Sequence, residues 1–167
     1  MADDAELLAL SVQLGQALLE RQWVLALAES CTGGWVAQSI TAIPGSSAWF
    51  DRGFVTYSNL AKEQMLGVSA STLEHYGAVS TATAQEMAAG SLAHSAADIS
   101  AAITGIAGPD GGSAQKPVGT ICFGWAHKNG YIMTQQMVFS GDREAVRRQS
   151  VKTSLNGLLQ LTLNTDL

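Results

Sequence analysis

The segment at residues 46–62, SSAWFDRGFVTYSNLAK, holds the groups best suited to chemistry. It begins with a serine pair, Ser46 and Ser47, and ends at Lys62. A serine can attack a carbonyl carbon without a histidine when a neutral lysine accepts the hydroxyl proton. The residue types therefore predict a serine nucleophile with Lys62 as its general base. The chemistry alone does not choose between Ser46 and Ser47.

Lys62 stands at an unusual place for a cation. Ser58 and Asn59 are typical helix caps, so the helix that follows them has Lys62 in its first turn. A positive charge there opposes the helix dipole, which lowers the pKa of a lysine. A surface lysine gains nothing from this position, whereas a general base must be neutral near pH 7. The placement favours a catalytic use of Lys62.

A second candidate region is the turn CTGG at residues 31–34, which follows the apolar run WVLALAES. A turn from a strand into a helix offers backbone N–H groups to an anion. Ser30, Thr32 and Gly33 are therefore candidates for substrate binding. The same pattern also fits a tight turn that holds no ligand.

Two further residues of this region need an explanation. Glu29 ends a buried strand, where an acid requires a partner. We expect it to orient the N–H groups of the turn, with contact to Lys62 or to a substrate amide as the alternative. Cys31 is a rival nucleophile because it precedes a helix. No histidine accompanies it and small buried cysteines are common, so we expect no catalytic role for Cys31.

The run GIAGPDGG at residues 105–112 follows another buried strand, ISAAIT. Its four glycines and one proline form a loop whose backbone can approach a ligand closely. Gly105 and Gly108 are therefore binding candidates, and Thr104 can donate its hydroxyl into the same crevice.

The order of the elements predicts an α/β fold. Helices are expected at residues 4–20, 35–43, 59–66, 81–97 and from 142 to the end, and strands at 23–30, 50–57, 99–104, 118–127 and 131–139. Asn129-Gly130 is a strong hairpin signal between the last two strands. We expect one domain, residues 1–167, with three α/β/α layers, a mixed and mostly parallel sheet, and a C-terminal β-hairpin plus helix. Its ligand crevice should lie at the carboxyl ends of the parallel strands.

The composition excludes several classes of protein. The net charge of −5 argues against general nucleic-acid binding, which needs a basic surface. Neither a membrane-spanning run nor a basic signal segment is visible, which predicts a cytoplasmic protein without a membrane partner. The two cysteines and three histidines lack ligand spacing, so no metal is expected. Basic residues cluster only in GDREAVRRQSVK, at Arg143, Arg147, Arg148 and Lys152, where an anion site or a solvated helix face is the alternative.

Segments along most of the chain resemble the competence/damage-inducible CinA C-terminal domain family: AESCTGGWVA, GSSAWFDRGFVTYSNLAKEQMLGV, GAVS, TGIAGPDGG, KPVGT and FSGDREAVRRQSV. The resemblance implies cofactor-free hydrolysis of nicotinamide mononucleotide to nicotinic acid mononucleotide and ammonia, as part of pyridine-nucleotide recycling. It also implies a Ser/Lys acyl-enzyme mechanism, and it leaves a homodimer open.

The resemblance assigns roles to individual residues. It implies Ser47 as nucleophile, Lys62 as general base and Tyr57 as the assisting tyrosine. With Ser47 as nucleophile, backbone N–H groups around Gly45 and Ser46 would stabilise the oxyanion. Thr104 and Arg143 match polar residues near the substrate. Arg143 is the expected phosphate ligand, with Arg147 or Arg148 as the alternatives.

Overall fold

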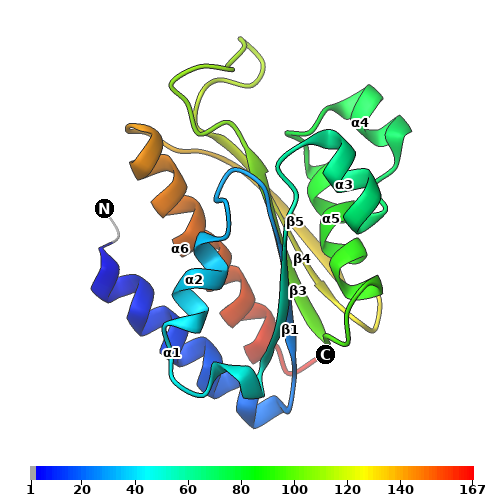
Figure 1. Ribbon diagram of the computed structural model, residues 1–167. Helices are drawn as coiled ribbons and strands as arrows, with labels where there is room; N and C mark the ends of the chain where they lie inside the picture. Colours follow the sequence, from blue (N-terminus) through cyan, green and yellow to red (C-terminus); the bar gives the residue numbers. More distant parts are fainter. Residues whose placement is uncertain (1–2) are drawn as a thin grey trace.

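The computed structural model describes residues 3–167 and arranges them in three layers around a five-stranded sheet (Figure 1). One face carries the helices α1, α2 and α6, and the other carries α3, α4 and α5. The helices are α1 Asp4–Arg21, α2 Trp35–Thr41, the 3-10 helix η1 Ser46–Ala48, α3 Asn59–Leu66, α4 Ala70–Tyr76, α5 Thr81–Ala93 and α6 Arg143–Leu163. The strands are β1 Leu25–Glu29, β2 Phe50–Val55, β3 Ile99–Gly105, β4 Thr120–His127 and β5 Ile132–Val138.

The sheet is mixed, with the strand order β2-β1-β3-β4-β5. The strand β1 pairs in parallel with β2 and β3, whereas β3–β4 and β4–β5 are antiparallel pairs. The predicted α/β fold with a C-terminal hairpin and helix is confirmed. The prediction missed α4, a helix of seven residues between Gly67 and Gly77.

The central strands are apolar because both of their faces are covered. Every residue of β1 is buried, which is typical of a parallel strand between two helical layers. Leu25 and Leu27 pack in the cluster that includes α1 and α6, while Ala28 packs in the cluster that includes α3 and α5. The alanine side chain on this face of β1 is small, which lets the helices α3 and α5 pack closely against the sheet.

A glycine fixes how closely α3 approaches α5. A Cβ atom built at Gly90 of α5 would collide with the carbonyl oxygen of Leu66, the last residue of α3. Only a residue without a side chain permits this contact. The position of α3, and with it the position of Lys62, therefore depends on Gly90.

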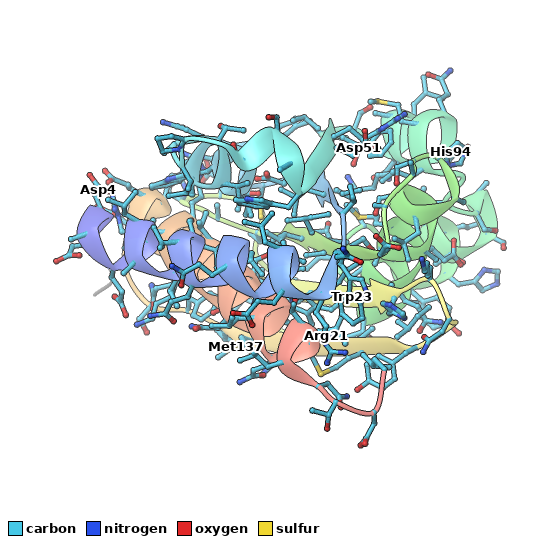
Figure 2. The ribbon with its side chains drawn as sticks, turned by 90° about the horizontal axis from the view of Figure 1, so that it is seen from below. Asp4, Arg21, Trp23, Asp51, His94 and Met137 are labelled. Carbon is cyan, nitrogen blue, oxygen red and sulfur yellow. The ribbon has the colours of Figure 1, made fainter. Side chains whose placement is uncertain are left out.

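The register of the parallel strands determines at which end of the sheet each connecting segment lies. Leu25 pairs with Phe50 and Glu29 pairs with Val55, so β1 and β2 begin together and end together. In Figure 1 the turn after β1 lies at the upper end, and the segment that leads into β2 lies at the lower end. Figure 2 gives the view from below, with Trp23, just before β1, and Asp51, near the start of β2, labelled. Within residues 3–167, no helix is both long and apolar enough to cross a membrane.

Candidate active site

Lys62 is a buried lysine without a counter-ion. Its residue is 1% exposed, its Nζ donates to the carbonyl oxygen of Thr56 at 2.9 Å, and it lies 3.1 Å from Ser30 Oγ. Within the described chain, no carboxylate forms an ion pair with this amine. A side chain on a helix leans toward the helix N-terminus, so α3 directs Lys62 toward the upper end of the sheet. The amine is therefore held by two neutral oxygen atoms.

Burial lowers the pKa of Lys62, because the charged form loses its hydration, and the nearby Cys31 thiol acts weakly in the opposite direction. The predicted lowering is thus supported, and burial is its main cause. The apolar residues Leu60 and Met65 of the same helix do not cover the lysine, because they are 59% and 40% exposed. Instead, Lys62 and Leu66 form the buried face of α3.

Ser30 is the hydroxyl that faces this amine. It directly follows β1 and is buried, and its N–H donates to the carbonyl oxygen of Ile103 at 3.0 Å, which anchors it to β3. The sequence placed Ser30 among the binding candidates and not beside Lys62. A hydroxyl 3.1 Å from an amine of lowered pKa has the geometry that a serine nucleophile and a lysine general base would need.

Ser47 lies far from Lys62, and the predicted pairing of these two residues is wrong. Ser47 belongs to η1, just before β2, whereas Thr56 and Lys62 follow β2. The six residues of β2 separate them by roughly 20 Å at about 3.3 Å per residue. Gly45 and Ser46 share the position of Ser47, so their N–H groups lie away from the lysine too. The parallel register of β1 and β2 is the physical cause.

Glu29 has the structural role that we favoured. It is 1% exposed, and its carboxylate accepts hydrogen bonds from Thr32 Oγ1 at 2.6 Å and from the N–H groups of Gly34 and Val36, both at 3.1 Å, and of Ala37 at 2.9 Å. These bonds occupy the first N–H groups of α2, which would otherwise attract an anion. The buried carboxylate of Glu29 therefore holds the turn after β1 in place.

This arrangement removes Thr32 and Gly33 from the binding candidates. Thr32 is buried with its hydroxyl bonded to Glu29, and Gly33 is exposed outside the pocket described below. Arg147 contributes to the same scaffold, because its guanidinium donates to the carbonyl oxygens of Cys31 and Thr32, both at 3.1 Å. Arg147 is thus engaged in holding the turn.

A pocket of about 220 Å³ lies over the Ser30–Lys62 pair. It is formed by the turn after β1, the start of α3, the segment before α5, the end of β3 and the start of α6. Its lining residues are Ser30, Cys31, Tyr57, Asn59, Lys62, Ala78, Val79, Thr104, Gly105, Ala107 and Arg143. The structure thus brings together the predicted residues Ser30, Tyr57, Lys62, Thr104, Gly105 and Arg143.

Sequence reasoning missed part of this lining. The sequence pattern predicted Asn59 only as a helix cap, but Asn59 also lines the pocket. Ala78 and Val79 carry no reactive group, and the only signal for them was the GAVS segment of the family resemblance. Thr104 Oγ1 donates to the carbonyl oxygen of Ala78 at 2.8 Å, so it holds this wall in place.

Tyr57 and Arg143 form the exposed rim of the pocket. Arg143 donates to the carbonyl oxygen of Gly108 at 2.7 Å and to the hydroxyl of Tyr57 at 3.1 Å. Gly108 therefore supports the arginine and is not itself part of the pocket lining. Tyr57 is 64% exposed, and its hydroxyl contacts Arg143 instead of Lys62. The geometry supports a role for Tyr57 in positioning the arginine and gives no direct proton path to the lysine.

Arg148 is engaged away from the pocket. It forms ion pairs with Asp4 and Glu144. Arg143 is therefore the cation that remains for a substrate at the pocket. Arg143 also lines a larger cleft of about 790 Å³ between α1, α2 and α6, so it stands where the two hollows meet.

Cys31 has the properties of an inert thiol. Burial is the main cause that raises the pKa of Cys31 to about 12, so the thiol stays protonated near neutral pH. The prediction that it does not act as the nucleophile is supported. Within residues 3–167, no three His, Cys, Asp or Glu side chains gather as a metal-binding group.

Comparison with known proteins places these features in a family. Residues 7–162 match the family model of the CinA C-terminal domain. The protein named nicotinamide-nucleotide amidohydrolase PncC from Enterobacter agglomerans is 59% identical over 151 residues, which cover 90% of this chain and 92% of that protein. The protein of the same name from Escherichia coli (strain K12) is 57% identical over 157 residues, or 94% of this chain and 95% of that protein.

A solved structure agrees with these relatives. The crystal structure of the competence/damage inducible protein CihA from Agrobacterium tumefaciens superposes with a TM-score of 0.92 at 42% sequence identity. The superposition covers 96% of this chain and 97% of that one.

Proposed function

The chain belongs to the CinA C-terminal domain family, and on this premise we propose that it hydrolyses nicotinamide mononucleotide to nicotinic acid mononucleotide and ammonia. Two relatives that cover nine tenths of the chain or more carry the name nicotinamide-nucleotide amidohydrolase. The observation that carries the proposal is the buried Ser30–Lys62 contact at 3.1 Å beneath an open pocket.

The reaction begins with Ser30. Its oxygen attacks the carboxamide carbon while its proton passes to Lys62 Nζ, whose neutral form is favoured because burial lowers its pKa. The ammonium of Lys62 then returns the proton to the amide nitrogen, the C–N bond breaks, and ammonia leaves. A nicotinoyl ester on Ser30 remains.

Water completes the cycle. Lys62, neutral again, takes a proton from a water molecule that attacks the ester carbon. The proton returns to Ser30 Oγ as the ester bond breaks, and the carboxylic acid product is released. The net reaction consumes one water and yields one ammonia, and the residues of the chain end as they began.

The pocket size indicates how the substrate lies. Sites that enclose a whole ligand usually measure roughly 300–1,000 Å³, and this one measures about 220 Å³. We infer that it encloses the pyridine ring with its carboxamide, while ribose and phosphate extend to the rim. Arg143 lies at that rim, and its guanidinium has N–H donors beyond the two bonded to Gly108 and Tyr57.

The direct test is an ammonia-release assay with nicotinamide mononucleotide and the purified protein, with nicotinic acid mononucleotide identified as the second product. We expect equal amounts of the two products. If no ammonia is released over a broad range of pH, the chain is a binding module that retains the pocket without turnover.

A further inference from the structure

Thr56 carries a buried hydroxyl that has no visible use. The residue is 0% exposed, and within residues 3–167 its Oγ1 has no hydrogen-bond partner. The carbonyl oxygen of the same residue accepts a hydrogen bond from Lys62 Nζ at 2.9 Å. We propose that Thr56 is a positioning residue whose Oγ1 accepts a hydrogen bond from the ammonium form of Lys62. The catalytic meaning of this inference rests on the proposed function.

A purely structural role does not explain a threonine at this position. A buried hydroxyl without a partner destabilises the folded state. Valine has the same branched shape and would fill the same space without that loss. The backbone of Thr56 gives no reason for the hydroxyl either, because its N–H continues the strand pairing through a bond to Glu29 O at 2.8 Å.

The chemistry of Lys62 supplies a reason. A neutral lysine amine has two N–H groups and one lone pair, which suit the carbonyl oxygen of Thr56 and the hydroxyl proton of Ser30. After Ser30 has given up its proton, Lys62 carries three N–H groups, and the serine oxygen is bonded to the substrate carbon. The ammonium then needs one more acceptor, and the free Oγ1 belongs to the residue that already holds it.

The other ionisable groups around Lys62 do not fill this place. The carboxylate of Glu29 is bonded to the turn and to α2, and Tyr57 is bonded to Arg143. Cys31 keeps its proton because burial raises the pKa of its thiol to about 12. Within the described residues, Lys62 has no ion pair with any of them.

The test is Thr56→Val, read by titration of Lys62 in ¹³C-lysine NMR and by the pH profile of kcat/KM. Loss of the acceptor disfavours the ammonium, so the pKa of Lys62 and the acidic limb should both fall by about one unit. Thr56→Ser should restore both values. Thr56→Ala also removes the hydroxyl and gives the same reading if the valine variant does not fold.

Ser154→Ala is the matched control. Ser154 Oγ is a second buried hydroxyl without a partner in the described chain, but it lies in α6 and outside the pocket. Its removal should leave the titration of Lys62 unchanged. An unchanged Lys62 titration in both folded Thr56→Val and Thr56→Ala would overturn the inference. A wild type that releases no ammonia would instead overturn the proposed function, while the NMR titration still decides the role of Thr56.

Discussion

At the scale of single residues, the two basic side chains of the pocket, Lys62 and Arg143, have different hydrogen-bond partners. Lys62 is buried between two neutral oxygens, which favours its uncharged form. Arg143 is held at the rim by Gly108 and Tyr57. A guanidinium stays charged at all relevant pH values. The lysine is therefore suited to proton transfer, and the arginine to binding an anion.

Arg143→Ala should raise KM for nicotinamide mononucleotide by about 10- to 100-fold. A charge-assisted contact to phosphate contributes about 1.5–3 kcal/mol. The dephosphorylated nucleoside lacks this contact and should be affected far less. Steady-state kinetics on both substrates measure the difference, with Arg148→Ala as the control because Arg148 pairs with Asp4 and Glu144. Equal losses on both substrates would place Arg143 in the scaffold or in the chemical step.

Tyr57→Phe should act in the same direction but less strongly. The phenol only accepts a bond from Arg143, so its loss should raise KM by about fivefold, as for a single net hydrogen bond. The value of kcat should change little. A fall in kcat of several orders of magnitude, with KM unchanged, would instead support the assisting role in catalysis that the family resemblance implied for Tyr57.

At the scale of elements, close contacts between helices and strands position the reactive groups. Glu29 fixes the turn that carries Ser30 through four hydrogen bonds. Gly90 sets the distance between α3 and α5, and α3 carries Lys62. Ser30 and Lys62 thus come from two rigid parts of the fold, and their contact depends on the packing between these parts.

Gly90→Ala should reduce stability and activity together. The added methyl group would meet the carbonyl oxygen of Leu66 and push α3 away from α5. Overpacking of this kind typically costs about 1–3 kcal/mol, and the shift should separate Lys62 from Ser30. Denaturant unfolding and ammonia release measure the two effects. Gln85→Ala, on the exposed side of α5, is the control and should change neither. Full activity in a destabilised Gly90→Ala protein would show that the contact tolerates this shift.

At the scale of the whole molecule, the fold was more predictable than the site. Apolar runs and Asn129-Gly130 are local signals, and they located the strands and the hairpin within a few residues. The helix α4 was missed because its seven residues show no clear apolar period. The Ser30–Lys62 contact joins residues 32 positions apart and follows from the register of β1 and β2. No short segment contains that information, so the prediction used the serine pair that precedes Lys62 in the sequence, from which the family resemblance selected Ser47.

The free energy of unfolding should also depend on pH through the ionisation of Lys62. Its folded pKa lies below its unfolded value of about 10.4. Between these two values the unfolded chain binds more protons, so this group makes the folded state more stable as pH rises. Lys62→Met removes the effect. Its melting temperature should exceed that of the wild type by more at about pH 6 than at about pH 10.5, just above the unfolded pKa. The raised pKa of Cys31 acts oppositely but is common to both proteins. A difference that does not change with pH would mean that the pKa of Lys62 is not lowered by folding.

The assignment of Ser30 as the nucleophile is tested most directly by the rate of ammonia release from nicotinamide mononucleotide in Ser30→Ala, with Ser47→Ala measured beside it. Ser30 Oγ lies 3.1 Å from Lys62 Nζ, whereas Ser47 lies at the opposite end of β2. Ser30→Ala should lower kcat by about 10⁴-fold or more, as for other serine nucleophiles, and Ser47→Ala should keep most of the wild-type rate. A folded Ser30→Ala protein with near-normal turnover, or a Ser47→Ala protein without turnover, would contradict the assignment.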